Sequence, residues 1–121
     1  MPRYLFMIYT PTDRSESDAV GTDLSRWVAF GRLLEEAGIK VADAHLAPPE
    51  TATTVRVRDG ELRVTDGPFA DTKEYLAGYY VLDATSGQEL VDLAAEVPSI
   101  HYGSVEIRPI DPLPAEPRER T

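Results

Sequence analysis

The chain contains no cysteine, and this absence removes several kinds of chemistry. Without thiols there is no disulfide framework, no thiolate nucleophile and no metal site built on cysteine ligands. The two histidines, His45 and His101, lie far apart in the sequence and show no H-x-H or H-x-x-x-H spacing, so we predict no metal ion. Because a glycine-rich phosphate loop, a G-x-S-x-G motif and a dinucleotide fingerprint are also missing, we predict no cofactor.

Positive charge and long apolar runs are also scarce. The 12 Lys and Arg residues stand against 21 Asp and Glu residues, which gives a formal net charge of −9. Nucleic acids and anionic membranes attract basic surfaces, so we expect neither as a partner. No apolar stretch approaches the roughly 20 residues of a membrane span, and the N-terminus shows no secretory pattern. A cytoplasmic location is the resulting expectation.

Six segments have the composition of β-strands. Two of them, joined by Asp59-Gly60, predict a hairpin over residues 53–65, because Asp-Gly between alternating runs favours a tight turn. Its arginines are expected to face water, which makes the hairpin a solvated ribbon. The remaining four segments are rich in β-formers or alternate, and they are predicted as the main strands: residues 3–9, 39–46, 78–84 and 102–110.

Two helices are predicted between these strands. Over residues 23–37 apolar side chains recur at helical spacing, and Thr22 or Asp23 offers an N-cap. A capping box of Ser86 and Glu89 starts the second helix, which we expect to end at Pro98.

The order of elements is β-α-β, a hairpin, then β-α-β. It predicts a ferredoxin-like α+β sandwich with two helices on one face of an antiparallel sheet, spanning residues 1–110. Residues 111–121 contain three prolines and alternating charges, and are predicted to be a solvated tail.

Two helices can cover only one face of such a sheet, yet both faces are apolar. In the first strand, Phe6 and Ile8 point to one side while Leu5 and Met7 point to the other. A monomer would leave this second apolar face in water. We therefore predict a homodimer in which two sheets pack face to face around a twofold axis.

The densest local pattern is the run Asp66-Gly67-Pro68-Phe69-Ala70-Asp71-Thr72-Lys73-Glu74. Asp-Gly-Pro is a strong turn signal, after which Phe69 is the natural anchor of the loop. Asp66 and Phe69 are therefore candidate ligand-binding residues, with Tyr79 as an aromatic wall and Arg108 as a carboxylate partner. Each also has a purely structural interpretation, from a turn bond for Asp66 to an interface contact for Tyr79.

His45 and Lys73 are the candidate catalytic residues. An unperturbed imidazole suits proton transfer at neutral pH, so His45 is the predicted general base. Lys73 could stabilise a developing anion. The alternatives are a histidine that only holds a strand end, and a lysine that pairs at the surface with Asp71 or Glu74.

The same run, followed by Gly78-Tyr79-Tyr80, resembles the signature of the YCII-related (DGPF-type) family, and residues 46–56 and 102–109 add further matches. The resemblance implies a dimeric α+β barrel of ferredoxin-like subunits. One enzymatic branch, including a dehydrochlorinase of hydroxylated aromatics, uses a His of the first helix with an Asp. Residues 23–37 contain no histidine, so that mechanism does not carry over.

Two functions from different classes remain open. The first is a small-molecule enzyme that abstracts a proton from, or eliminates a group from, a small aromatic substrate. The second is a non-catalytic module that senses a ligand or regulates a partner. Some similar sequences are encoded near extracytoplasmic-function sigma factors, so the resemblance connects this second function with sigma-factor-dependent transcription.

Overall fold

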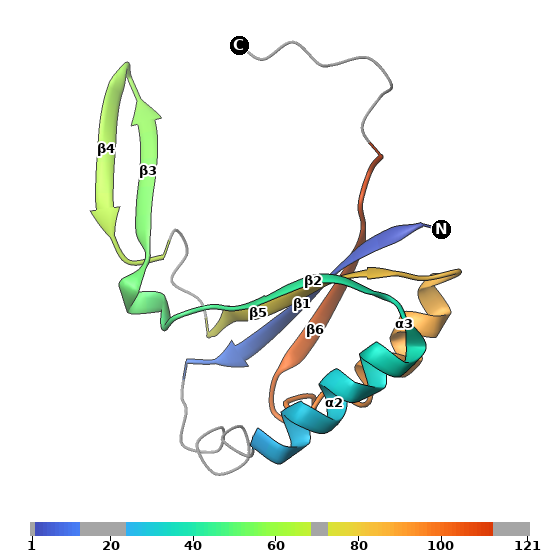
Figure 1. Ribbon diagram of the computed structural model, residues 1–121. Coiled ribbons are helices and arrows are strands. Elements are labelled where there is room, and N and C mark those ends of the chain that lie inside the picture. The colour runs from blue at the N-terminus through green and yellow to red at the C-terminus, as the bar shows by residue number, and fades with distance from the viewer. Residues whose placement is uncertain (1, 13–23, 69–72, 113–121) are drawn as a thin grey trace.

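A computed structural model describes residues 2–12, 24–68 and 73–112. Two helices lie on one face of a four-stranded antiparallel sheet, and a two-stranded hairpin stands apart from it (Figure 1). The elements in chain order are β1 Arg3–Pro11, α2 Leu24–Ala37, β2 Lys40–His45, the 3₁₀ helix η1 Pro49–Thr51, β3 Thr53–Arg58, β4 Glu61–Asp66, β5 Glu74–Asp83, α3 Gly87–Ala94 and β6 Ser104–Pro109.

The strand order of the main sheet is β2-β5-β1-β6, and every neighbouring pair is antiparallel. This order makes the chain a ferredoxin-like α+β domain, and it confirms the predicted fold class. The central strand β1 pairs on both sides, so that Phe6 lies opposite Tyr80 of β5 and opposite Ile107 of β6.

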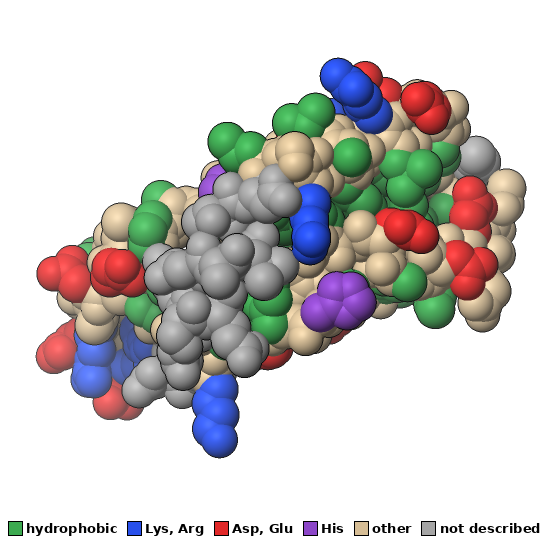
Figure 2. All heavy atoms as spheres, turned by 90° about the horizontal axis from the view of Figure 1, so that it is seen from below, with side chains coloured by type: hydrophobic (Ala, Val, Ile, Leu, Met, Phe, Trp, Pro, Cys, Tyr) green, Lys and Arg blue, Asp and Glu red, His purple; other side chains and the backbone are tan. Residues whose placement is uncertain are grey.

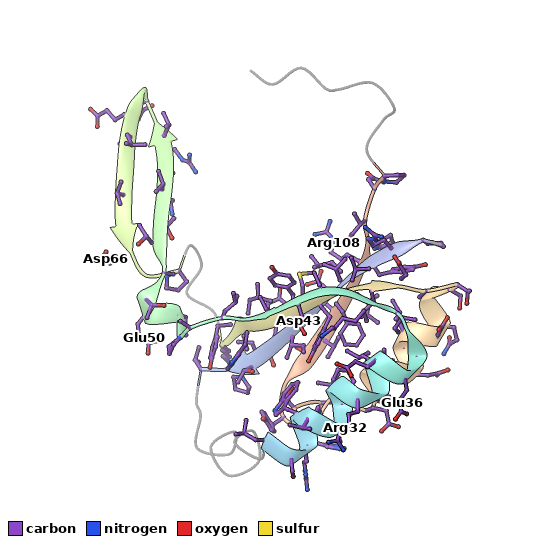
Figure 3. All side chains as sticks on the ribbon, viewed as in Figure 1. Arg32, Glu36, Asp43, Glu50, Asp66 and Arg108 are labelled. Carbon is purple, nitrogen blue, oxygen red and sulfur yellow. The ribbon has the colours of Figure 1, made fainter. Side chains whose placement is uncertain are left out.

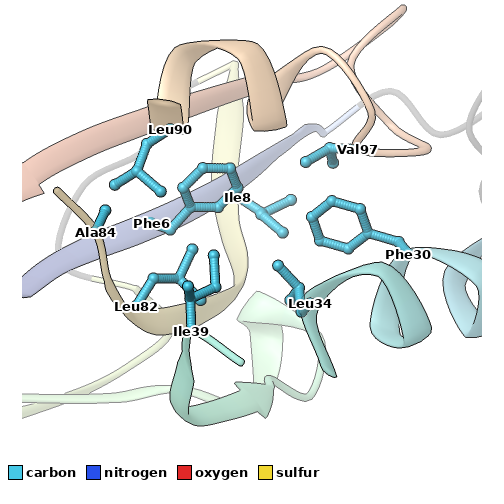
Figure 4. Close-up of a cluster of buried hydrophobic side chains, with 9 residues drawn as sticks. All are labelled: Phe6, Ile8, Phe30, Leu34, Ile39, Leu82, Ala84, Leu90 and Val97. Carbon is cyan, nitrogen blue, oxygen red and sulfur yellow. The ribbon is translucent and has the colours of Figure 1, made fainter. Parts of the chain in front are cut away.

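The hydrophobic core lies between the sheet and the two helices. Its largest fully buried side chains are Phe6, Leu34, Leu82, Leu90 and Val97 (Figure 4). Three rings connect the layers edge to face, because Phe30 of α2 lies 5.6 Å from Tyr80, and Tyr80 lies 6.3 Å from Phe6 between ring centroids. Edge-to-face packing is a favourable geometry for aromatic pairs, so these rings help to hold α2 on the sheet.

The first helix ends where the sequence predicts, and its described part begins at Leu24, because residue 23 lies outside the described residues. Gly38 adopts φ 68° and donates its amide to the Leu34 carbonyl, which is the expected left-handed cap. The predicted N-cap at Thr22 or Asp23 lies outside the described residues, as do residues 113–121 of the predicted tail.

The second helix is shorter than predicted. The Glu89 amide donates to the Ser86 hydroxyl as expected, but the Glu89 carboxylate accepts from the Thr85 amide and hydroxyl, which closes the capping box one residue earlier. The helix ends at Ala94 rather than at Pro98, because Glu96 and Val97 donate to carbonyls three residues back and tighten the chain into turns.

The strand β5 begins at Glu74, four residues before the predicted start. Because this first residue is charged, the sequence pattern does not indicate a strand there. In the structure Glu74 pairs with Pro11 of β1. The pairing shifts between Ile8 and Tyr9, where one extra residue, Ala77, stands in β5 as a bulge.

The hairpin of β3 and β4 was predicted correctly, with a turn in which Asp59 (φ 54°) and Gly60 (φ 76°) both have positive φ. We call residues Thr53–Asp66 the arm. Figure 1 shows the arm rising from one end of the sheet, on the side away from α2 and α3.

Candidate functional site

The face of the main sheet that the helices leave uncovered is called the open face. Pairing places two cross-strand rows on it: Tyr79, Met7 and Glu106 in one row, and Val81, Leu5 and Arg108 in the next. The apolar members of both rows are half-buried, whereas Glu106 and Arg108 are exposed. The open face therefore has an apolar middle and a charged edge along β6.

A cavity of about 440 Å³ lies at the end of the open face where β1 ends and β5 and β6 begin. It is wide-mouthed and is lined by Tyr9, Glu74, Ser104, Val105 and Glu106. The Ser104 hydroxyl donates to the Glu74 carboxylate at 2.7 Å, which connects β6 to the start of β5 across the cavity. The lining thus combines two carboxylates, a hydroxyl and a phenol.

Backbone packing holds Tyr9 at this position. A side chain on Gly103 would collide with the Tyr9 carbonyl oxygen, so only glycine lets the turn before β6 approach β1 so closely. The bulge at Ala77 changes the partner of β1 at this point, and Tyr9 pairs with Leu76 rather than with Ala77.

The Tyr9 hydroxyl is held in its protonated form. Partial burial raises the pKa of Tyr9, and the negative charge of the nearby Glu106 carboxylate raises it further, against the lowering effect of Arg108. The hydroxyl itself donates to Met7 Sδ at 3.8 Å. At neutral pH the phenol is therefore a hydrogen-bond donor. The Glu74 and Glu106 carboxylates beside it are acceptors, so the cavity suits a ligand that has donors or positive charge.

The helix side differs from the open face in its charge pattern. On the helix side, acidic and basic side chains of the described residues are interspersed, and the basic ones form no continuous field (Figure 2). Within the same residues, no three His, Asp or Glu side chains are grouped so that they could hold a metal ion. The described helices are too short or too polar to cross a membrane.

The sequence model of the YCII-related domain matches residues 3–114. The chain belongs to the YCII-related family. An uncharacterized protein of Rhizobium meliloti (strain 1021) is 40% identical to it over 99 residues, which cover 80% of this chain and 77% of the relative. The resemblance read from the Asp66–Glu74 signature is thereby confirmed, and family membership brings no assigned reaction with it.

The structure of this YCII-related domain places two of the predicted ligand-binding residues on the open face. Tyr79 is half-buried in the middle of it, and Arg108 lies at the β6 edge on the side away from α2 (Figure 3). Asp66 is exposed at the base of the arm, where β4 ends (Figure 3). Phe69 lies outside the described residues.

The predicted catalytic pair is not part of the cavity lining. His45 is exposed at the end of β2 and pairs with Gly78, so its side chain leaves the sheet on the helix side. Lys73 is also exposed, and its carbonyl accepts from the amide and the hydroxyl of Thr12. The roles of His45 and Lys73 in proton transfer remain predictions.

Sequence reasoning missed three of the four polar lining residues, Tyr9, Ser104 and Glu106, whereas it named Glu74 as part of the Asp66–Glu74 run. Alternation in the last strand does place Ser104, Glu106 and Arg108 on one face. It does not show that this face meets Tyr9, because the register between β1 and β6 comes from the folded sheet.

Proposed function

We propose that this YCII-related protein is a homodimer that binds a small organic molecule on the open face, in the cavity beside Tyr9. The observation that supports this best is the lining itself, in which the Glu74 and Glu106 carboxylates face a phenol that keeps its proton. Binding sites combine apolar surface with a few placed polar groups, and the adjacent Met7 and Tyr79 supply the apolar part. A small aromatic molecule with hydroxyl or amino donors fits this chemistry.

The apolar middle of the open face supports the dimer. Leu5, Met7, Tyr79 and Val81 lie there half-buried, and a second sheet packed on them would remove the rest of their surface from water. A partner sheet would also narrow the wide mouth of the cavity. Light scattering at micromolar concentration should give about twice the chain mass of 13.4 kDa, and a monomer would contradict the dimer.

The binding step is tested by a thermal-shift screen with small phenols, aromatic amines, aromatic acids, quinones and lactones. A ligand present at about 100 times its Kd stabilises the native state by about 2.7 kcal/mol. Glu106→Gln should remove this shift, because the cavity loses a charged acceptor. Glu36→Gln on α2, at the opposite side of the sheet, is the matched control and should leave the shift unchanged (Figure 3). Equal shifts in both variants would contradict binding at this cavity.

The catalytic form of the proposal is proton abstraction from, or elimination on, a bound aromatic molecule. Glu106 is the base that adjoins the cavity, and His45 with Lys73 is the pair that the sequence predicts. Glu106→Gln and His45→Ala separate these assignments, because only replacement of the residue that takes the proton should abolish turnover. Unchanged turnover in His45→Ala would remove the imidazole from the mechanism.

The non-catalytic alternative is ligand sensing without turnover, and the wide mouth of the cavity favours it. Proton-transfer sites gain from excluding water, which strengthens the electrostatic interactions inside them. This cavity is open in the single chain. A ligand that shifts the melting temperature but is recovered unchanged after prolonged incubation would support the sensing function, including a regulatory role linked to sigma-factor-dependent transcription.

A further inference from the structure

We infer that the arm is a docking element whose apolar face packs against a second copy of this chain. The inference rests on the homodimer of the proposed function and extends it, because it assigns part of the interface to a segment outside the main sheet. The sequence predicted a solvated ribbon with outward arginines, and the inference concerns the other face of that ribbon.

One face of the arm carries four exposed apolar side chains, with the polar pair Thr53 and Asp66 on the same face at its base. Val55 lies opposite Val64, and Val57 lies opposite Leu62, so all four side chains project to the same side. Their exposed fractions are 58%, 61%, 58% and 68% in that order. An isolated two-stranded hairpin is marginally stable in water, so a hairpin of this composition needs a surface to pack on.

The base of the arm sets its direction away from its own core. The Gly67 amide donates to the Ala52 carbonyl at 2.7 Å, and the Thr54 hydroxyl donates to the Gly67 carbonyl at 2.8 Å. These bonds close the arm where it leaves η1 and returns toward β5. The apolar face consequently remains exposed in the single chain rather than folding onto the sheet.

The direction of the arm indicates which molecule would cover its apolar face. Figure 1 shows that it projects to the side of the sheet opposite α2 and α3, which is the side of the open face. A second copy seated on the open face would therefore stand next to the arm. In a twofold dimer both arms are used in the same way, since each surface patch meets its equivalent contact in the partner.

The arm would add apolar area to the dimer interface. The apolar side chains of the open face are half-buried, whereas the four on the arm are more than half exposed. A standard interface takes about 800 Å² from each partner, and the arm offers more apolar surface per side chain toward that area than the open face does.

Charge also favours a second copy. The chain has a formal net charge of −9, and two copies repel each other. The arm is locally neutral, because its three arginines match its three acidic residues: Arg56, Arg58 and Arg63 against Asp59, Glu61 and Asp66. An electrically neutral, apolar element is a part of this acidic molecule that can approach another copy with little repulsion.

The test uses the absence of cysteine in the chain, so that one introduced thiol reports on one position. Leu62→Cys places a thiol on the apolar face, and Arg63→Cys places one on the opposite face of the same strand. In the dimer we expect the thiol at position 62 to react with a disulfide reagent at least about tenfold more slowly than that at position 63, the ratio corresponding to about 1.4 kcal/mol of protection. Dilution below the dimer Kd should equalise the rates.

A second variant tests the same contact without an introduced thiol. Replacing Val57 and Leu62 together by threonine keeps β-propensity but removes apolar contact, and it should weaken the dimer Kd by at least about tenfold. Arg63→Thr is the control and should not. If light scattering shows a dimer in which both thiols react equally, the arm inference fails while the dimer stands. If the chain is a monomer, the proposed dimer and the arm inference both fail.

Discussion

The carbonyl oxygen of Ala44 lies 2.7 Å from the point where a β-carbon on Gly78 would stand. Gly78 has an ordinary backbone conformation, so glycine is needed here because it has no side chain and not because of its φ angle. The strands β2 and β5 approach each other closely at the pair of His45 and Gly78. Real β-carbons do not come this near to another atom, and the contacting atoms are backbone rather than the end of a flexible side chain.

Gly78→Ala should therefore destabilise the fold by about 1–3 kcal/mol, the usual cost of overpacking. Urea denaturation measures the effect as a lower midpoint. The matched control is Gly31→Ala in α2, where a β-carbon meets nothing within 4 Å. There alanine should stabilise by about 0.5–1 kcal/mol through its higher helix propensity. Equal effects of the two substitutions would show that β2 can move away from β5.

Leu82→Ala tests the core between sheet and helices. Leu82 is fully buried, so its truncation should lower the free energy of unfolding by about 2–5 kcal/mol through lost burial and the remaining cavity. Val91→Ala on α3 is the control, because Val91 is 53% exposed and its change should stay within about 0.5 kcal/mol. A small loss at Leu82 would mean that the helices do not seal this face of the sheet.

Arg3 and Asp83 should make stability depend on acid pH. The Arg3 guanidinium donates to Asp83 at 2.9 Å, and this hydrogen bond, together with the positive charge, lowers the pKa of Asp83. The stabilisation is present above the unfolded pKa of about 3.9 and is lost as pH falls through the lower folded pKa. The effect is small because the pair faces solvent.

The check is urea denaturation across acid pH for the wild-type chain and for Asp83→Asn. The variant should show a flatter decline in stability on acidification. Arg3→Gln should have the same effect, and the double variant should add nothing to either. Additive losses would mean that the two residues do not interact.

Tyr9 should make stability depend on pH in the alkaline range. Its pKa is raised by burial and by Glu106, so its contribution to stability is complete below the unfolded pKa of about 10 and is lost as pH rises through the folded pKa. Difference absorbance between wild type and Tyr9→Phe isolates the ionisation of this phenol. Glu106→Gln should lower the pKa of Tyr9, and an unchanged titration would show that the charge of Glu106 does not act on this phenol.

Much of the fold follows from local sequence signals. Gly38 ends the first helix because it accepts a left-handed conformation, and Asp59-Gly60 forms the hairpin turn for the same reason. The strand alternation around Phe6 is equally direct, since the side chains of one face become the core. These features depend on neighbours within a few positions, which is why the sequence alone predicts them.

The candidate site depends on distant pairing and could not be predicted in the same way. Glu74 comes beside Ser104 only because β5 and β6 flank β1, and residues 30 positions apart have no local signal for that contact. The start of β5 at Glu74 was missed because a charged residue opens the strand. Likewise, alternation shows that Val57 and Leu62 share a face, but only the structure shows that both side chains are more than half exposed.

The extra residue in β5 determines which of the first side chains of this strand face the cavity. Ala77 is inserted opposite the step from Ile8 to Tyr9, and every residue before it in β5 is displaced by one position relative to a regular ladder. If the ladder instead ran on regularly with Ala77 opposite Tyr9, the period of two would turn Glu74 and Leu76 to the other surface. Deleting Ala77 removes the bulge and keeps Leu76 opposite Tyr9 and Glu74 opposite Pro11, so the shortened strand should still present Glu74 beside Ser104.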